Sequence, residues 1–214
     1  MALTLYHHPL SSYCWKALIA LYEADIGFSG QVVNLGDPAD RAAFQAIWPL
    51  GKFPVLRDEA RGATVPEATI IIEYLAQHWP AARGLLPADP ERAWRTRLRD
   101  RLFDNYVHDP LQRIVAERMR PADRRDPHGV EASKALLRQG YGVVAPEGEW
   151  AMGDEFTLAD CAALPALFYA DYAVSLAEWP ELAAYLGRLK ARPSVARVIA
   201  EAQPFFHWFP LKDG

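Results

Sequence analysis

Apolar and polar residues follow two different patterns along the first 78 positions of the chain. Short apolar runs bounded by Pro, Gly and Asp are typical of strands, and longer runs with apolar residues three or four positions apart are typical of helices. These patterns predict strands at 2–6, 30–35, 54–57 and 63–66, and helices at 15–24, 37–46 and 68–78. The resulting order is βαβαββα, which makes the first part of the chain an α/β domain.

No strand pattern follows this region. Prolines and a glycine interrupt 79–89, which we interpret as a linker between a first domain at 1–78 and a second at 90–214. The second domain is predicted to be all-helical, with a long helix at 92–118 that bends at Pro110. Further helices are predicted at 128–144, 158–171, 180–191 and 194–202.

One of these helices has a clear start signal. Thr157 is followed three residues later by Asp160, so each side chain can accept a hydrogen bond from the other residue's backbone amide. This capping box predicts a helix from position 158, with a role in folding.

Composition narrows the class of protein. The chain has 214 residues, a net charge of −4 and 23 basic residues spread along its length, so nucleic acid is not an expected partner. No apolar run is long enough for a membrane span, and the N-terminus lacks a secretory-signal pattern. We therefore expect a cytoplasmic protein with no membrane partner.

Two cysteines and six histidines are present. The cysteines are too few for a disulfide framework, and the histidines show no zinc-binding spacing, so no metal site is expected. Cys14 lies near a predicted helix start, where a single cysteine is more often a small buried apolar residue than a reactive thiol.

Ser11 and Ser12 stand at the predicted N-terminus of the first helix. A hydroxyl in this position can cap free backbone amides, which is its commoner role. It can instead donate a hydrogen bond to a ligand's thiolate, because a helix N-terminus also favours negative charge. Both interpretations stay open from the residues alone.

Two later positions are also candidates for ligand binding. The Phe53–Pro54 bond can be cis, since proline is the residue that permits this form at low cost. The backbone N–H and C=O of Phe53 would then be offered to an extended peptide. Glu67 precedes the predicted helix at 68–78, where its carboxylate can cap amides or accept a ligand's ammonium group.

Taken together, these stretches resemble the glutathione transferase superfamily over essentially the whole chain. The matching motifs are Ser11-Ser12-x-x-Trp15-Lys16, Gly51-Lys52-Phe53-Pro54-Val55, Glu67-Ala68-x-x-Ile71 and Phe156-Thr157-x-Ala159-Asp160. The resemblance implies a thioredoxin-like N-terminal domain that binds glutathione as co-substrate, and an all-helical C-terminal domain that supplies much of the pocket for a hydrophobic electrophile. It also implies a homodimer.

The resemblance implies roles for particular residues. Ser11 aligns with the catalytic serine of the serine-type classes, such as theta and zeta, which stabilises the glutathione thiolate. Lys52 is implied to bind the glycyl carboxylate of glutathione, with Arg41 as a second candidate. The implied glutathione-binding residues are Ser11, Lys52, Phe53, Pro54, Glu67 and Ala68.

Two positions depart from the family pattern. Ala68 stands where Ser or Thr usually follows the acid, and Trp48 where Asn is frequent. Losing one hydrogen bond costs about 0.5 to 1.5 kcal/mol, which predicts weaker glutathione binding and does not exclude it. For the electrophile pocket, the candidates are Tyr13, Phe103, Tyr106 and His108.

The leading functional hypothesis is conjugation of the glutathione thiolate to a hydrophobic electrophile. The alternatives are a glutathione-dependent isomerase or dehalogenase of the zeta type, thiol–disulfide exchange at Cys14, and a binding protein that keeps the fold without catalysis. The aromatic tail at 205–209 is expected to pack on the helical domain or to cover the electrophile pocket.

Overall fold

The computed structural model describes residues 3–212, and within them four strands form a single sheet of order β2-β1-β3-β4. β1 pairs in parallel with β2 and antiparallel with β3, and β3 pairs antiparallel with β4. Leu5 on β1 lies opposite Leu56 on β3, and both side chains are fully buried. The strands are β1 (Leu3–His7), β2 (Ser29–Val32), β3 (Val55–Asp58) and β4 (Ala63–Pro66).

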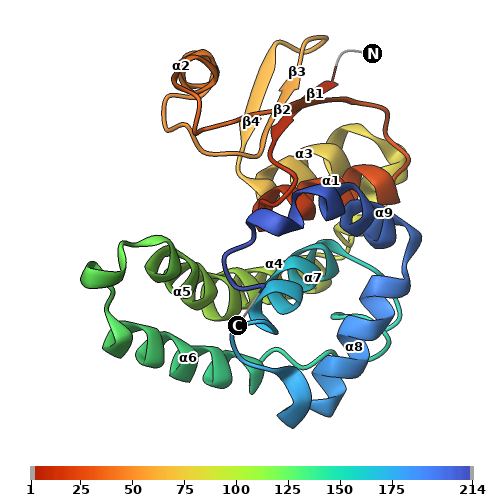
Figure 1. Ribbon diagram of the computed structural model, residues 1–214. Helices are drawn as coiled ribbons and strands as arrows, with labels where there is room; N and C mark the ends of the chain where they lie inside the picture. Colours follow the sequence, from red (N-terminus) through yellow and green to blue (C-terminus); the bar gives the residue numbers. More distant parts are fainter. Residues whose placement is uncertain (1–2, 213–214) are drawn as a thin grey trace.

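Three helices accompany the sheet: α1 (Ser12–Glu23), α2 (Pro38–Ile47) and α3 (Ala68–His78). α1 and α3 lie between the sheet and the helical half of the molecule, and α2 stands apart from them at the other side of the sheet (Figure 1). Phe44 of α2 packs there with Val33 and Val55 in a small second core. The order is βαβαββα, which confirms the predicted thioredoxin-like domain.

Helices make up most of the described residues that follow. α7 is the centre of this helical part, because each of its residues is buried, and it packs against α1 so that one large core runs through both halves. None of the helices in 3–212 is long and apolar enough to cross a membrane. The elements are η1 (Pro80–Leu85), α4 (Pro90–Leu102), η2 (Phe103–His108), α5 (Asp109–Met119), η3 (Ala122–Arg124), α6 (Pro127–Tyr141), α7 (Leu158–Ala170), η4 (Leu176–Glu178), α8 (Pro180–Ala191), α9 (Pro193–Ala202) and η5 (Gln203–Trp208).

The predicted helix at 92–118 is continuous but contains a wider turn where a bend was expected. Residues of η2 form a π-helix, in which the Asp109 amide donates to the Asp104 carbonyl five residues earlier. Pro110 has no N–H to give to the Tyr106 carbonyl, so ordinary helical pairing fails at this point. Gly140 of α6 approaches the freed carbonyl so closely that an added Cβ would lie 2.1 Å from its oxygen.

The predicted capping box at the start of α7 is present. Thr157 caps the helix, and the Asp160 carboxylate accepts a hydrogen bond from the Thr157 amide at 2.8 Å. The same carboxylate accepts from the Ala151 amide and from the Tyr185 hydroxyl, which lies 2.6 Å away. This set of residues, which we call the capping cluster, is completely buried.

The aromatic tail packs against α7. The Phe206 ring stacks on Tyr169 and the Phe209 ring lies 5.0 Å from the same tyrosine, measured between ring centroids. Phe205 turns the other way and meets the edge of His8 at 6.1 Å. The tail therefore anchors on the helical core and also touches the segment that leads into α1.

Candidate functional site

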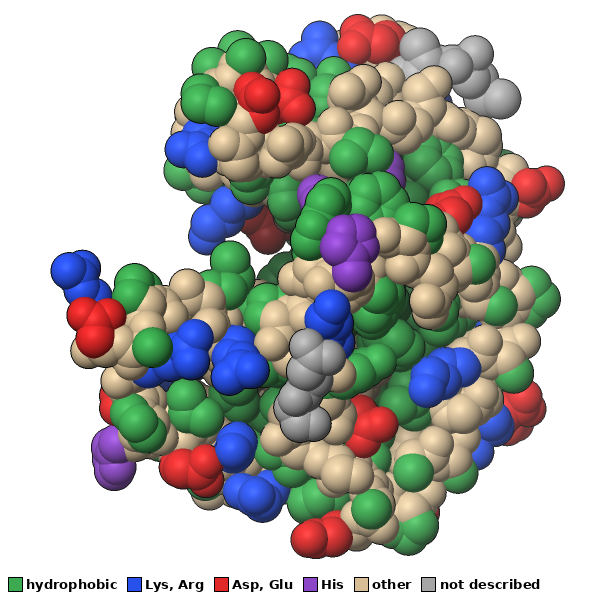
Figure 2. Space-filling view, in the orientation of Figure 1, with side chains coloured by type: hydrophobic (Ala, Val, Ile, Leu, Met, Phe, Trp, Pro, Cys, Tyr) green, Lys and Arg blue, Asp and Glu red, His purple; other side chains and the backbone are tan. Residues whose placement is uncertain are grey.

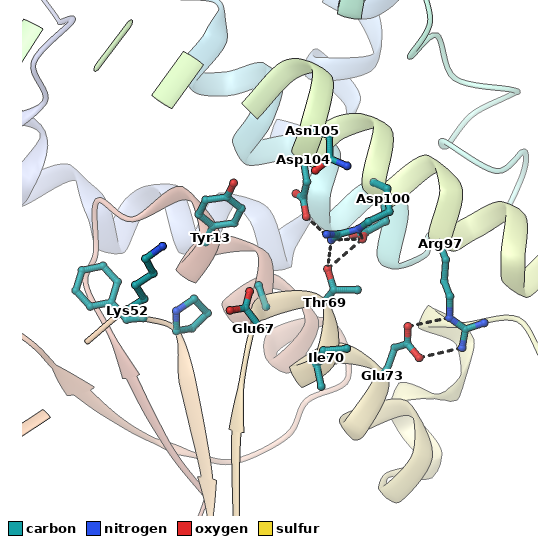
Figure 3. Close-up of a pocket in the computed structure, with 14 residues that line it drawn as sticks. Tyr13, Lys52, Glu67, Thr69, Ile70, Glu73, Arg97, Asp100, Asp104 and Asn105 are labelled. Carbon is teal, nitrogen blue, oxygen red and sulfur yellow. Dashed lines mark hydrogen bonds and ion pairs between the residues drawn. The ribbon is translucent and has the colours of Figure 1, made fainter. Parts of the chain in front are cut away.

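A cavity of about 560 Å³ lies where the N-terminal end of α3 and the loop before β3 face α4 and η2. The molecule is visibly hollowed between its sheet-containing half and the α5 end of its helical half (Figure 2). Six of the candidate site residues predicted from the sequence line this cavity. The lining includes Tyr13, Lys52, Phe53, Pro54, Glu67 and Ala68 (Figure 3).

Ser11 is the N-cap of α1. Its backbone is extended, and its Oγ accepts a hydrogen bond from the Cys14 amide at 3.3 Å. The hydroxyl also lies beside the Cys14 thiol, and a hydrogen bond from Ser11 acts to lower the pKa of that thiol. Ser11 is not part of the cavity lining itself but lies two residues before Tyr13, which is. Because a neutral thiol is a weak acceptor, a ligand's thiolate can take this hydrogen in its place while the Ser11 oxygen continues to cap the helix.

Ser12 has different surroundings. It is buried, and its Oγ lies 2.5 Å from Nε2 of His108. The side-chain amide of Gln112 donates to the same hydroxyl oxygen at 3.3 Å. Burial, assisted by the positive charge of Lys16, lowers the pKa of His108 to about 3, so this histidine is neutral at physiological pH.

The structure brings one of the four predicted electrophile-pocket residues to the cavity. Tyr13 lines it, and its ring stacks on His108 at 4.1 Å. His108 lies beneath Tyr13, Phe103 is fully buried in the core, and Tyr106 is 54% exposed. The π-helical turn changes the direction in which Tyr106 and His108 face, whereas Phe103, whose amide still bonds to the Arg99 carbonyl, follows the ordinary period of α4.

Tyr13 is a hydrogen-bond donor at neutral pH. Burial, followed by the nearby carboxylate of Asp104, raises the pKa of its hydroxyl to about 12. In Figure 3 this hydroxyl points away from Lys52 and Glu67.

Cys14 lies inside the core. Burial raises the pKa of its thiol to about 12, so it remains protonated at physiological pH. Because the thiolate is the reactive form of cysteine, this environment does not favour thiol–disulfide exchange.

The Phe53–Pro54 peptide bond is cis. No backbone hydrogen bond to the N–H or C=O of Phe53 is formed within residues 3–212. Both groups are therefore free to pair with an extended ligand in the adjacent cavity.

Glu67 has an unusual backbone conformation at the entrance to α3. Its φ of 70° and ψ of 120° lie in a region that non-glycine residues rarely adopt, at a cost of about 1 to 3 kcal/mol. Ala68 is the first residue of the helix, where backbone amides lack intrahelical partners. The strained residue thus brings a carboxylate and a free helix N-terminus to one wall of the cavity.

A cluster of opposite charges lies beneath this wall. Lys16 is fully buried, and its Nζ pairs with Asp100 and lies 2.8 Å from both Asp104 Oδ2 and Thr69 Oγ1. Arg101 pairs with both aspartates from the cavity side. We call Lys16, Thr69, Asp100, Arg101 and Asp104 the ionic cluster. No local sequence pattern predicts this cluster, because its members come from α1, α3, α4 and η2.

The charged groups of the cavity wall divide into two kinds. Arg97 forms two hydrogen bonds with Glu73, and Arg101 is engaged in the ionic cluster (Figure 3). Lys52 and Glu67, by contrast, have no ion pair or side-chain hydrogen bond within the described part of the chain. A free cation and a free anion on one wall are complementary to a ligand that carries both charges.

Arg41 is not among the lining residues. It donates to the Leu35 carbonyl on an exposed surface. Among residues 3–212, no group of three or more His, Cys, Asp or Glu side chains is arranged to hold a metal ion.

Known proteins match this chain along most of its length. Family models described as the glutathione S-transferase N-terminal and C-terminal domains match residues 5–83 and 127–188. A glutathione S-transferase of Pseudomonas putida is 28% identical over 94% of this chain and 93% of its own. A maleylacetoacetate isomerase of Aspergillus fumigatus is 29% identical over 94% and 91%.

A solved structure agrees with these matches. The glutathione S-transferase of Methylobacillus flagellatus, with glutathione bound, superimposes with a TM-score of 0.81 at 26% identity, covering 92% of this chain and 98% of that one. The matched domains, the relatives and the shared architecture lead to one conclusion: this chain belongs to the glutathione S-transferase superfamily.

Proposed function

We propose that the protein is a glutathione transferase in which Ser11 stabilises the thiolate of glutathione for attack on a hydrophobic electrophile. The observation that carries this proposal is the pair of unpartnered charges, Lys52 and Glu67, on the wall of a cavity close to Ser11, whose hydroxyl has only a weak acceptor beside it. Glutathione is a tripeptide with an ammonium group and a carboxylate near one end and a second carboxylate at the other.

The cavity accommodates each part of this ligand. Lys52 takes the glycyl carboxylate, and Glu67 takes the γ-glutamyl ammonium group. The free amide of Ala68 at the α3 terminus meets the γ-glutamyl carboxylate. The backbone of Phe53, beside Pro54, pairs with the cysteinyl residue. Solved relatives that hold glutathione or glutathione sulfonate support glutathione as the ligand.

The chemistry requires only a small change in thiol acidity. A hydrogen bond to a charged acceptor contributes about 1.5 to 3 kcal/mol, which corresponds to a pKa decrease of roughly one to two units. The N-terminus of α1 adds favourable potential at the same place. The thiol proton passes to solvent, and the thiolate sulfur forms the new bond to the electrophilic carbon. With an aryl halide, the carbon–halogen bond then breaks and the halide leaves with the electron pair of that bond.

We further propose that two copies of the chain assemble through α3 and α4. Ile70 on α3 is 51% exposed, and Trp94 and Leu98, one turn apart on α4, are 47% and 48% exposed. Exposed apolar side chains on neighbouring helices are a feature of subunit interfaces. Light scattering should give twice the mass of one chain.

The test of the catalytic proposal is Ser11→Ala assayed with an aryl halide. The expected result is a decrease in kcat/KM of about tenfold to a hundredfold, since one to two units of thiol acidity are lost. Circular dichroism should show an unchanged fold. Activity equal to that of the unmodified protein would contradict the role of Ser11.

Glutathione-dependent isomerisation is the second candidate. It is favoured by matches to maleylacetoacetate isomerases, such as the 29% identical protein of Aspergillus fumigatus. Tyr13 stands where the zeta pattern has a cysteine, and this difference argues against the isomerase. Maleylacetone turned over faster than an aryl halide would favour the isomerase, and no activity with no retention on immobilised glutathione would favour a binding protein.

A further inference from the structure

Two adjacent serines stand at the N-terminus of α1, yet their hydroxyl groups are in different situations. Ser11 is partly exposed, and its hydroxyl lies beside the Cys14 thiol, which is only a weak acceptor. Ser12 is 5% exposed and contacts two side chains of the helical half, His108 and Gln112.

Gln112 determines which atom donates in the hydrogen bond between Ser12 and His108. The side-chain nitrogen of Gln112 lies 3.0 Å from His108 Nε2 and 3.3 Å from Ser12 Oγ. An amide nitrogen donates hydrogen bonds and does not accept them. His108 Nε2 therefore presents a lone pair, and the hydrogen shared between Nε2 and Ser12 Oγ belongs to the serine.

The surroundings of His108 keep this arrangement in place. The ring is 1% exposed and lies against Tyr13, with an angle of 20° between the two planes. Burial has the largest effect on the pKa of His108 and lowers it, and the positive charge of Lys16 lowers it further. The carboxylate of Asp109 raises the pKa, but its effect is smaller than that of burial. The ring is thus held neutral and fixed in orientation.

We propose that His108 and Gln112 select which of the two serines activates glutathione. They hold the hydroxyl hydrogen of Ser12 inside the protein and leave Ser11 as the only serine donor at the helix terminus. This inference rests on the proposed function. His108 does not touch glutathione in this arrangement, so it is a positioning residue.

The first test needs no glutathione. Nitrogen NMR of the histidine side chains distinguishes a ring protonated at Nδ1 from one protonated at Nε2. We expect His108, assigned by its loss in His108→Phe, to be neutral with an unprotonated Nε2. A protonated Nε2 would have to donate to Ser12, which would free the serine hydrogen and overturn the proposal.

The second test follows the ultraviolet absorbance of bound glutathione thiolate against pH. Ser12→Ala should keep the amount of thiolate at pH 7 within about twofold of the unmodified protein, whereas Ser11→Ala should lose about tenfold or more. In Ser11→Ala/His108→Phe, the phenyl ring still stacks on Tyr13 but accepts no hydrogen bond from Ser12. The Ser12 hydroxyl can then donate to the glutathione sulfur in place of Ser11, and part of the thiolate absorbance should return.

The outcomes separate the two proposals. Loss of thiolate in Ser12→Ala as large as in Ser11→Ala overturns serine selection, and so does a folded double variant without recovery. If the double variant does not fold, the Ser12→Ala result decides. Absence of thiolate in the unmodified protein contradicts the proposed function, and the NMR experiment then still tests the state of His108.

Discussion

The capping cluster and the ionic cluster both bury carboxylates, but the groups that pair with these carboxylates differ in charge. In the capping cluster, Asp160 is surrounded by uncharged donors from Ala151, Thr157 and Tyr185. Burial raises the pKa of Asp160 even though each of these hydrogen bonds acts to lower it. In the ionic cluster, the carboxylates of Asp100 and Asp104 face two cations instead.

The difference lies in what each cluster connects. Asp160 and Thr157 lie within one turn of the same helix, so the capping cluster mainly defines where α7 begins. Lys16 and Asp104 are 88 residues apart in sequence and join α1 to the helical half. Thr69 adds the first turn of α3 to the same cluster. The ionic cluster therefore fixes the two helix N-termini that meet at the cavity.

Removing the buried cation should have the largest effect on stability. Lys16→Met leaves two buried carboxylates with Arg101 as their remaining cation, and breaking such a pair costs about 3 to 5 kcal/mol. Urea denaturation measures the loss. In the matched control Arg97→Met, the exposed pair with Glu73 should contribute about 1 kcal/mol or less. Equal effects of the two variants would remove the distinction between buried and exposed pairs.

A smaller effect is expected at the capping cluster. Asp160→Ala should lower the free energy of unfolding by about 2 to 3 kcal/mol, because it leaves the buried donors of Thr157 and Tyr185 without a partner. The affinity of the folded variant for glutathione, measured by calorimetry, should be unchanged. A parallel decrease in affinity would mean that this cluster also supports the cavity.

The π-helical segment connects Asp104 and His108, and its packing against α6 can be tested at glycine. Gly140→Ala places a Cβ 2.1 Å from the Tyr106 carbonyl oxygen and should destabilise the protein by about 1 to 3 kcal/mol. Gly187→Ala is the control, since nothing lies within 4 Å of its added Cβ. On the exposed face of α8 this change should stabilise by up to about 1 kcal/mol. Stabilisation by both substitutions would contradict the close approach of α6.

The neutral state of His108 predicts a pH dependence of stability. The pKa of His108 is about 3 in the folded protein, compared with the ordinary value of 6.5 that applies to the unfolded chain. Between pH 3 and pH 6.5, the imidazole therefore binds a proton in the unfolded chain but not in the folded protein. Stability from this residue is complete above pH 6.5 and decreases by about 1.4 kcal/mol per unit as pH falls below it. His108→Phe should remove this part of the slope in denaturation measured at several pH values. An unchanged slope would show that His108 is charged when folded.

Local patterns in the sequence were enough to predict most of the fold. Period and turn residues located β4, α3 and α8 at the positions where the structure has them, and Thr157 with Asp160 predicted the start of α7. The helix of α1 begins at Ser12, three residues before the predicted start, because Ser11 acts as its cap. These features depend on neighbours within a few residues, which a sequence displays directly.

The candidate site was only partly predictable, because many of its contacts join residues that are far apart in the sequence. The grouping of Lys52, Phe53 and Glu67 followed from motifs, whereas the partners of Lys16 depend on how two domains pack. The direction of Tyr106 depends on the helix register, which the π-helical turn changes. The positive φ of Glu67 has no signal in its residue type, since glycine or asparagine is usual there.

The most direct measurement of the central claim is a crystal structure of the protein with glutathione bound. We expect the sulfur within hydrogen-bonding distance of Ser11 Oγ, the γ-glutamyl end at Glu67 and the glycyl carboxylate at Lys52. A sulfur atom held by Ser12 or Tyr13, or a tripeptide bound outside this cavity, would contradict it.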